Sequence, residues 1–385
     1  MRILQVIPTL ARGGAESVVV DLSNELSQMG HSVYVLLAYP VPSSESRTHS
    51  LKREVKVQYL RNNSPSRFNS YLDLMRFIVT NRSFIKGFDI VHCHLSLGQF
   101  FGFVWRTINL FHSEPGPKLI YTCHNVGGDN PRWQNQLDRI STRVFTDFVL
   151  MAQSKTWRSF VAGRKKRNIF LIENGISMSI ETKKEMFKEW RTRTLSVGTI
   201  SRLQVERKPW RFLEVFASLK SQSNRGFIFL LGGEGPLRKS LEIQAESLNL
   251  ESQIVFPGIV YSPKPFLDSL DIYLTLNVEA ITGIAGLEAV FNGIPVIALQ
   301  LLPDYKATSD DWIWSSADPA EVASKIDEIS RNPVLARRLI QNQQLVAKKR
   351  FKSKIMVKKY LRLYTTNCHL ISNSNKFEII KISPL

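Results

Sequence analysis

Three cationic side chains follow an apolar stretch near the middle of this 385-residue chain. Residues 195–200 read Leu-Ser-Val-Gly-Thr-Ile, and Arg202, Arg207 and Lys208 come after them. Guanidinium and ammonium groups bind phosphate oxygens through charge-assisted hydrogen bonds. If 195–200 is a parallel strand, these cations stand beyond its carboxyl end, where open α/β sheets bind ligands. The spacing therefore predicts a diphosphate site, with an ordinary solvated loop as the alternative.

Two carboxylates lie farther along the chain. Glu279 is in a predicted loop, and Glu288 opens an apolar stretch that predicts a helix over 286–292. A carboxylate at the start of a helix commonly caps its free amides. It can also accept hydrogen bonds from two hydroxyls of a sugar, and both interpretations stay open.

Three histidines lie on or directly after predicted strands in the first half of the chain. His92 and His94 share one face of a strand, a spacing that two metal ligands can have, but no further ligand stands nearby in the sequence. A structural role, or one that supports a neighbouring functional residue, is therefore preferred to a metal site for the pair. His124 comes directly after the strand 119–123, a better position for a functional residue. The chain has no Asp-x-Asp triplet, so a carboxylate cage for nucleotide-bound magnesium is not indicated.

Two glycine-rich loops each join a predicted strand to a helix. The first contains Gly13 and Gly14, and the second runs from Gly232 through Gly233 and Gly235. Glycines allow close approach of a ligand, and helix N-termini favour anions. Arg238 stands where a dinucleotide fingerprint needs its third glycine, and no Walker lysine follows either loop, so nicotinamide and P-loop sites are disfavoured.

The elements that hold these residues alternate between short apolar strands and amphipathic helices, which predicts an α/β fold with parallel sheets. The alternation restarts after a charged segment, 183–193, which we expect to cross the surface. We predict two doubly wound domains, 1–182 and 195–350. A C-terminal helix near 350–364 is expected to pack back on the first domain, and the lysines of the basic segment 348–362 are expected to point outward.

Net charge, hydrophobic run length and cysteine content indicate which partners and which cellular location to expect. Lys and Arg number 51 against 33 Asp and Glu, a net charge of +18, so an anionic partner is expected. No apolar run has the length of a membrane span, the first residues do not resemble a signal peptide, and the three cysteines do not form a disulfide scaffold. We expect a cytoplasmic protein, held peripherally at the inner face of a membrane by segments such as 155–167. Nucleic acid is not an expected partner, because no binding motif accompanies the charge.

Taken together, these segments resemble the retaining glycosyltransferases of family 4, which have the GT-B fold of two Rossmann-like domains facing across a cleft. The resemblance runs from Ile3 to about Tyr364. Seven motifs occur in the order typical of the family, at 12–16, 89–94, 121–125, 173–176, 197–208, 232–237 and 279–298.

The resemblance implies a hexosyltransferase that moves a sugar from a nucleotide-diphosphate sugar to a polysaccharide or lipid-linked acceptor, with retained configuration and without metal or cofactor. Bacterial surface polysaccharide or lipopolysaccharide is the expected setting. The catalytic residues that it implies are His124, Glu279, Arg202 and Lys208. The donor-binding residues that it implies are Gly14, Arg202, Lys208, Gly233, Glu279, Gly283, Ile284 and Glu288.

The chain departs from the family pattern at two places. Eight residues separate Glu279 from Glu288, where the family usually has seven, which puts the role of Glu279 in question. The interval from Arg202 to Lys208 is one residue longer than usual, so Arg207 is an alternative to Lys208 as a diphosphate ligand. The alternative functions are a nucleotide-sugar epimerase of the same fold and a catalytically inactive homologue. Pocket shape sets the donor sugar, nucleotide, acceptor and linkage, so the sequence predicts a reaction class.

Overall fold

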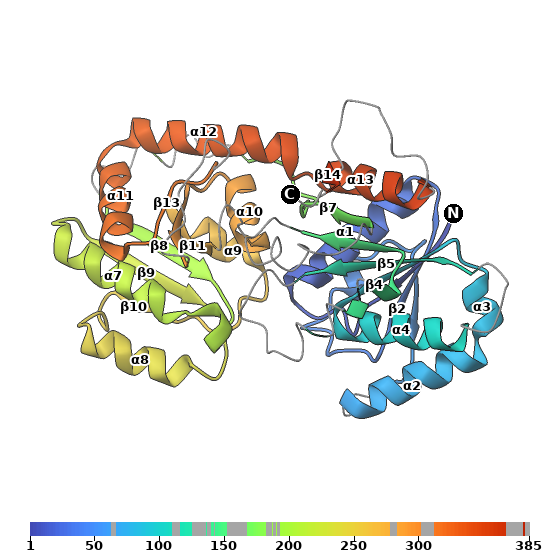
Figure 1. Ribbon diagram of the computed structural model, residues 1–385. Coiled ribbons are helices and arrows are strands. Elements are labelled where there is room, and N and C mark those ends of the chain that lie inside the picture. Colours follow the sequence, from blue (N-terminus) through green and yellow to red (C-terminus); the bar gives the residue numbers. More distant parts are fainter. Residues whose placement is uncertain are drawn as a thin grey trace. The chain divides into compact units, whose positions relative to one another are not determined.

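The chain forms two compact units, shown in Figure 1. Unit 1 comprises Met1–Ser177 and Lys352–Leu385, and unit 2 comprises Met178–Phe351. The computed structural model describes residues 1–62, 67–109, 116–124, 136, 140–141, 143–151, 168–181, 187, 190, 193–277, 283–301, 312–366 and 380–381.

Unit 1 is built on an eight-stranded sheet in the order β14-β7-β6-β5-β4-β1-β2-β3. All neighbours pair in parallel except β14, which is antiparallel to β7. The order reverses between β1 and β4, because β1 pairs with both β2 and β4. The strands are β1 (Arg2–Val6), β2 (Ser32–Leu37), β3 (Lys56–Tyr59), β4 (Ile90–His94), β5 (Lys118–Cys123), β6 (Asp147–Leu150), β7 (Asn168–Leu171) and β14 (Ile380–Lys381).

The two faces of this sheet differ in chemistry. Alternate residues such as Leu4, Val91 and Leu119 belong to an apolar core with helices α2 and α4. The residues between them include buried Gln5 and His92, and this face is covered by α1 and α13, which contact each other (Figure 1). The helices of unit 1 are α1 (Gly14–Gln28), α2 (Arg67–Thr80), α3 (Arg82–Lys86), α4 (Leu95–Ile108) and α13 (Ser353–Thr365), with a 3₁₀ turn, η1, at Thr48–Ser50.

Unit 2 carries a six-stranded parallel sheet in the order β10-β9-β8-β11-β12-β13, whose order reverses between β8 and β11. The strands are β8 (Leu195–Ile200), β9 (Phe227–Gly232), β10 (Ile254–Val255), β11 (Ile272–Asn277), β12 (Val296–Gln300) and β13 (Ser315–Ser316). Helix α7 contacts α8 and α11, and α10 contacts α9 and α12. These helices are α7 (Trp210–Gln222), α8 (Arg238–Ser247), α9 (Pro263–Asp268), α10 (Ile284–Phe291), α11 (Pro319–Arg331) and α12 (Pro333–Arg350), with a 3₁₀ turn, η3, at Val205–Arg207.

The predicted α/β class with two doubly wound sheets is confirmed. The helix predicted near 350–364 corresponds to α13, which belongs to unit 1 and contacts α1. The chain breaks between the end of α12 at Arg350 and the start of α13 at Ser353. The break has a physical cause: the backbone at Lys352 bridges to Ile176, and the Ser353 amide donates to the Ile176 carbonyl over 3.1 Å.

The segment 183–193 is also not simply a surface crossing. Phe187 and Trp190 are buried against each other, with ring centroids 5.0 Å apart. The indole of Trp190 donates to the carboxylate of Asp271 over 3.1 Å, and Arg193 donates to the same carboxylate. This segment therefore anchors to the sheet of unit 2 through its aromatic residues.

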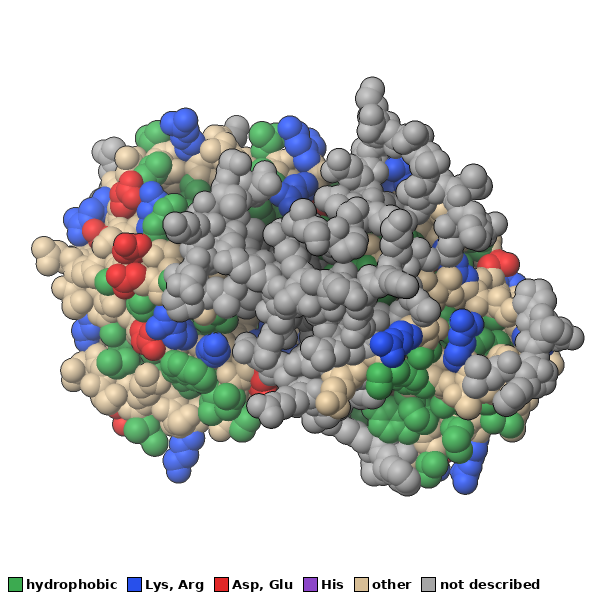
Figure 2. All heavy atoms as spheres, in the orientation of Figure 1, with side chains coloured by type: hydrophobic (Ala, Val, Ile, Leu, Met, Phe, Trp, Pro, Cys, Tyr) green, Lys and Arg blue, Asp and Glu red, His purple; other side chains and the backbone are tan. Residues whose placement is uncertain are grey.

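Within the described parts of the chain, no helix has the length and apolar character that crossing a bilayer requires. On the face shown in Figure 2, the Lys and Arg side chains of the described residues are spread over both units among hydrophobic and polar groups. They do not gather into one basic patch on the visible, described part of this face.

Candidate functional site

The strand order of unit 2 reverses between β8 and β11, so the loop after β8 lies at the switch point of the sheet. Strands β9 and β11 flank β8, so the connections that leave β8 and β11 diverge to opposite faces of the sheet. Such a switch point is where open α/β sheets bind ligands, beyond the carboxyl ends of the strands. Arg202 is exposed two residues beyond β8 and therefore lies at this point.

The glycine loop after β9 packs directly on the segment that carries Arg202. A Cβ at Gly233 would lie 1.9 Å from the Ser201 carbonyl oxygen, and one at Gly235 would lie 2.4 Å from that of Leu203. Both glycines have positive φ, and the Gly233 amide donates to the Gly258 carbonyl over 2.8 Å. In the structure these glycines thus permit close packing of the two loops.

The other cations of this loop lie around a short 3₁₀ turn, η3. Lys208 follows the turn in the left-handed conformation, with φ of 44°, which is uncommon for a residue with a side chain. Although Arg207 as a whole is exposed, partial desolvation of its guanidinium and then the charge of Arg202 lower its pKa, while Glu206 acts in the opposite direction. Arg202 and Arg207 are therefore close enough to repel each other.

Glu288 lies on the other side of the switch point. Helix α10 begins at Ile284 with Gly283 as its N-cap, so Glu288 is in the second turn and does not open or cap the helix as predicted. Burial raises the pKa of Tyr273 to about 12, and the charge of Glu288 adds to this rise. The Tyr273 hydroxyl accepts from the Ile200 amide at 3.2 Å, so the half-buried Glu288 lies near the end of β8.

The remaining predicted residues of unit 2 are located as follows. Gly283 is exposed, with nothing within 4 Å of a Cβ placed there, and Ile284 begins α10. Glu279 lies outside the described residues.

In unit 1 the corresponding edge carries His124, His94 and Gly14. His94 ends β4, and His124 follows β5, its neighbour in the sheet. Gly14 is exposed at the start of α1, one loop beyond β1. The Nδ1 atom of His94 lies 2.9 Å from Nε2 of His124, so two histidines that are distant in sequence form one hydrogen-bonded pair.

A buried polar network continues from this pair across the sheet face. Nε2 of His94 meets Oε1 of Gln5 at 2.8 Å. His92 meets the Tyr364 hydroxyl at 2.7 Å through Nδ1 and the Thr122 hydroxyl at 2.7 Å through Nε2. Hydrogen bonds to side chains thus satisfy all four ring nitrogens of His92 and His94, which fits the structural role preferred for the pair.

Burial fixes the charge state of these rings. It lowers the pKa of His124 to about 3, and it lowers the pKa values of His92 and His94 well below the usual 6.5. The three rings are therefore neutral at pH 7. Among the described residues, no group of three or more His, Cys, Asp or Glu is arranged to hold a metal ion.

The sequence analysis missed Gln5 and Tyr364 as members of this network. Gln5 could have been found, because it is the one polar residue inside the apolar strand β1 and is completely buried. Tyr364 carried no local signal, since its contact with His92 joins residues 272 positions apart.

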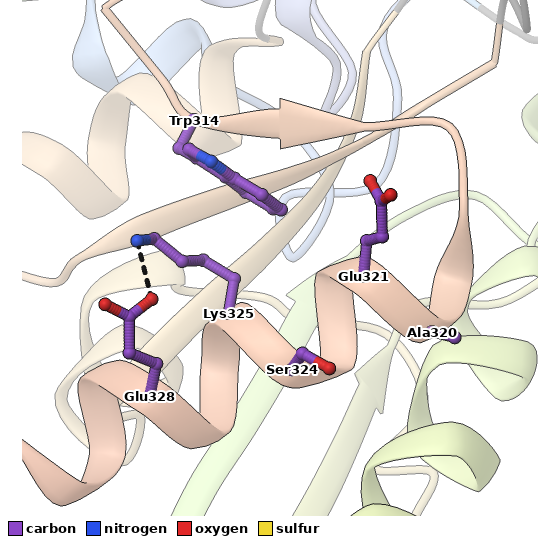
Figure 3. A pocket seen from close by; sticks show the side chains of 6 residues that line it. All are labelled: Trp314, Ala320, Glu321, Ser324, Lys325 and Glu328. Carbon is purple, nitrogen blue, oxygen red and sulfur yellow. Dashed lines mark hydrogen bonds and ion pairs between the residues drawn. The ribbon is translucent and has the colours of Figure 1, made fainter.

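A hollow of about 580 Å³ lies elsewhere in unit 2, between α11 and the residue that precedes β13 (Figure 3). Its charged groups already have partners. Lys325 pairs with Glu328 at 2.7 Å and lies 5.7 Å from the centre of the Trp314 ring, and Glu321 accepts from the Ser316 hydroxyl at 2.6 Å. It sits at the sheet edge rather than at the switch point, so it is not the candidate site.

Comparisons with known proteins cover both units. A family model described as Glycosyltransferase Family 4 matches residues 12–179, and one described as Glycosyl transferases group 1 matches residues 181–346. A putative glycosyltransferase, EpsF, of Bacillus subtilis is 22% identical over 321 residues, which cover 77% of this chain and 78% of that protein. An alpha-1,4-N-acetyl-D-galactosaminyltransferase of Campylobacter jejuni, named for a diNAcBac-PP-undecaprenol-linked substrate, is 26% identical over 65% of this chain and 66% of its own length.

Solved structures agree in fold. TarM has a TM-score of 0.73 at 13% identity, covering 95% of this chain and 99% of that one. Alr3699/HepE of Anabaena, solved in complex with UDP and glucose, has a TM-score of 0.71 at 16% identity, covering 95% of this chain and 100% of that one. WaaG, a glycosyltransferase involved in lipopolysaccharide biosynthesis, has a TM-score of 0.66 at 14% identity, covering 95% of this chain and 100% of that one.

Proposed function

The chain belongs to the family 4 glycosyltransferases of GT-B fold, and from this premise we propose a specific reaction. It transfers a hexosyl group from a nucleotide-diphosphate sugar to a saccharide acceptor, with retained anomeric configuration and without a metal ion. The donor binds at the switch point of unit 2.

The observation that carries this proposal is the cation cluster after β8. Arg202 and Lys208 form no ion pair with any described residue, and Arg202 and Arg207 repel each other. A diphosphate would relieve this repulsion through charge-assisted hydrogen bonds. In the reaction the same cations would neutralise the charge that develops on the departing nucleoside diphosphate, the task that a magnesium ion performs in other enzymes.

The other roles follow by resemblance. Glu288 would accept hydrogen bonds from the ribose hydroxyls, and Glu279 with the amides near Gly283 and Ile284 would meet the donor sugar. Gly14 would leave room for phosphate and acceptor at the edge of unit 1. His124 would approach the donor sugar near the reaction centre, as a neutral ring, because burial keeps its pKa low.

We infer the acceptor class from charge and from the names of relatives. A net charge of +18 favours an anionic or pyrophosphate-linked lipid acceptor and peripheral attachment to the cytoplasmic face of a membrane. The Campylobacter relative is named for an undecaprenol-linked substrate, and an alpha-monoglucosyldiacylglycerol synthase of Streptococcus pneumoniae is 25% identical over 31% of this chain and 28% of its own length. Surface polysaccharide or lipopolysaccharide biosynthesis would be the setting.

The test is turnover of a panel of nucleotide sugars in the presence of EDTA. UDP-glucose, UDP-galactose, UDP-N-acetylglucosamine and GDP-mannose are incubated with the protein and extracted bacterial lipids. We expect one of them to release its nucleoside diphosphate at an undiminished rate in EDTA, and proton NMR to show the donor's anomeric configuration in the product.

Three results would contradict the proposal. Dependence on added magnesium would contradict the metal-free mechanism. Conversion of the donor to an epimer without an acceptor would favour the epimerase. Binding of a donor with no turnover of any kind would favour an inactive homologue.

A further inference from the structure

We propose that His94 and Gln5 are positioning residues for His124, because they determine which nitrogen of the His124 ring carries the proton. The hydrogen-bond order that we infer leaves Nδ1 of His124 as an acceptor for a hydroxyl group of the bound sugar. That His124 faces a sugar rests on the proposed function, whereas the hydrogen-bond order rests on the contacts alone.

The three side chains form a continuous chain of hydrogen bonds. Oε1 of Gln5 lies 2.8 Å from Nε2 of His94, and Nδ1 of His94 lies 2.9 Å from Nε2 of His124. Gln5 and His94 have no exposed surface, whereas His124 remains partly accessible at the edge of the sheet. Water therefore has no access to Gln5 or His94. His124 is the end of the hydrogen-bond chain that a ligand can reach.

The order of donors and acceptors follows from elementary chemistry. An amide oxygen can only accept, so Nε2 of His94 must carry the proton that it donates to Gln5. A neutral imidazole has one N–H, which makes Nδ1 of His94 an acceptor and Nε2–H of His124 the donor. The proton of His124 is thereby placed on Nε2, and its Nδ1, which has no hydrogen-bond partner among the described residues, keeps a lone pair.

The orientation of the Gln5 amide decides this order. With the assigned orientation, Nε2 of Gln5 forms no hydrogen bond to a described residue. Burial and then Tyr360 raise the pKa of Tyr364, and the side chain of Gln5 acts to lower it. The Gln5 side chain therefore lies near the Tyr364 hydroxyl. In the assigned orientation its amide oxygen faces Nε2 of His94 at 2.8 Å, and the spectrum described below tests this orientation.

The backbone holds His94 in place. His94 pairs in register with Thr122 of β5, two residues before His124, so the two histidines project from neighbouring strands. Leu95 follows in the left-handed region, with φ of 55°, and starts α4 without an intervening loop. Gly98 brings α4 onto β4, because a Cβ there would lie 2.9 Å from the carbonyl carbon of Cys93.

His92 provides a matched control on the same strand. It is as buried as His94, lies on the same face and also has both ring nitrogens hydrogen-bonded, but to Tyr364 and Thr122 instead of His124. Replacing either histidine by leucine removes two buried hydrogen bonds, and only the His94 variant alters the partner of His124.

The first test is a long-range ¹H–¹⁵N correlation spectrum of the protein with ¹⁵N-labelled histidine. Each of the seven histidines gives a pattern that reports whether Nδ1 or Nε2 is protonated. We expect Nε2–H for both His94 and His124, assigned by single substitutions. An Nδ1–H state of either ring, which a reversed Gln5 amide would produce, would overturn the inference.

The second test compares three variants by spectrum and by turnover of the nucleotide sugar that the wild type uses. In His94→Leu we expect a mixed tautomer of His124 and a kcat about 10- to 100-fold lower, with KM for the donor changed less than about threefold. His94→Asn keeps an acceptor near the position of Nδ1 and should restore both the single tautomer and most of kcat. His92→Leu should keep the His124 tautomer and a kcat within about twofold of wild type.

The outcomes separate the two proposals. An unchanged His124 tautomer in His94→Leu, or an equal loss of kcat in His92→Leu, would overturn the positioning role. If the wild-type spectrum shows the expected ring states and no nucleotide sugar is turned over, the hydrogen-bond order stands and the proposed function fails. If a sugar is turned over with reversed ring states, the function stands and this inference fails.

Discussion

Arg202 is the side chain on which the proposed donor site depends most. It lies beyond the central strand of unit 2, and the positive charge that it shares with Arg207 and Lys208 has no ion-pair partner among the described residues. Hydrogen bonds to a charged group contribute about 1.5–3 kcal/mol each when formed away from bulk water. A single guanidinium can therefore decide whether a nucleoside diphosphate binds.

We predict that Arg202→Ala weakens binding of the nucleoside diphosphate about 10- to 100-fold, because it removes at least one such bond. Titration calorimetry in EDTA measures the effect. Lys239→Ala is the matched control, since Lys239 is an exposed cation on α8, and its substitution should change the affinity less than about twofold. Equal affinities in all three proteins would place the diphosphate elsewhere.

Residue types and their spacing select some members of the candidate site, and they cannot select others. Arg202 and Glu288 could be selected because their types suit phosphate and sugar and because strands precede them at the right distance. The pairing of His94 with His124 could not, since it depends on β4 and β5 being neighbours with His94 in register with Thr122. Strand register is a property of the folded sheet, and local sequence does not record it.

At the scale of elements, the loop after β9 and the loop after β8 form one packed layer. The Leu203 amide donates to the Glu234 carbonyl at 3.0 Å, and the Leu237 amide donates to the Leu203 carbonyl at 3.0 Å. Gly233 and Gly235 allow this contact, because any side chain there would collide with the backbone of 201–203. The glycine loop thus shapes the segment that carries Arg202.

We predict that Gly233→Ala destabilises unit 2 by about 2–4 kcal/mol, because its Cβ would lie 1.9 Å from a carbonyl oxygen and its φ of 130° disfavours a side chain. Gly283→Ser is the control: nothing lies within 4 Å of its Cβ, and serine is a good N-cap for α10, so stability should change by less than about 1 kcal/mol. Equilibrium unfolding in urea gives the free energy of unfolding of both variants. A Gly233→Ala variant as stable as wild type would contradict the role of Gly233 in packing the two loops.

Helix α13 is attached to unit 1 by polar as well as apolar contacts. The hydroxyl of Tyr364 bonds to His92 and that of Tyr360 bonds to Thr122 at 2.9 Å, and all four side chains are buried. Lys118 donates to the Leu363 and Thr366 carbonyls at the end of the helix, at 2.5 and 3.0 Å. These contacts join the C-terminal half of α13 to the middle strands β4 and β5 of the sheet.

We predict that Tyr364→Phe lowers the free energy of unfolding by about 1–3 kcal/mol, because Nδ1 of His92 loses its buried partner. Tyr360→Phe should cost less, about 0.5–1.5 kcal/mol, since Thr122 keeps its bond to His92. Equilibrium unfolding in urea gives both values. Equal costs, or none for Tyr364→Phe, would mean that the phenol of Tyr364 does not satisfy the ring.

Element boundaries were predictable where composition changes sharply, as at β1, β5 and β8. They were not predictable where contacts between distant segments determine where an element begins or ends. The 3₁₀ turn η1 has a polar sequence with no helical period, and strand β3 alternates polar and apolar residues over only four positions. The break between α12 and α13 arises because Lys352 bridges to Ile176. That bridge joins segments far apart in the chain, so the sequence predicts a helix near 350–364 but not the residue at which it begins.

At the scale of the whole molecule, the buried histidines couple folding to pH. His92, His94 and His124 are neutral in the folded chain because burial lowers their pKa values, whereas each binds a proton below pH 6.5 when unfolded. Their contribution to stability is complete above pH 6.5 and is lost as pH falls toward the folded pKa values. Asp21 acts in the opposite sense, because burial raises its pKa to about 6 and the folded chain then holds one more proton between pH 6 and 4.

We predict a net difference of about two protons between pH 6 and 5, so the free energy of unfolding of unit 1 falls by about 2.7 kcal/mol over that unit. Chemical denaturation at closely spaced pH values measures the slope. His92→Leu should reduce it by about one proton, leaving about 1.4 kcal/mol per pH unit. A flat profile between pH 6.5 and 5 would mean that these rings are not buried in their neutral form.

The central claim, that unit 2 binds a nucleoside diphosphate at its switch point without a metal, is tested most directly by hydrogen–deuterium exchange. The protein is compared with and without UDP or GDP at millimolar concentration in EDTA. We predict slower exchange with one nucleotide in peptides covering 201–208 and 284–288, and none of this change in Arg202→Ala. Protection confined to the hollow at Trp314 and Lys325, or no protection with either nucleotide, would contradict the account.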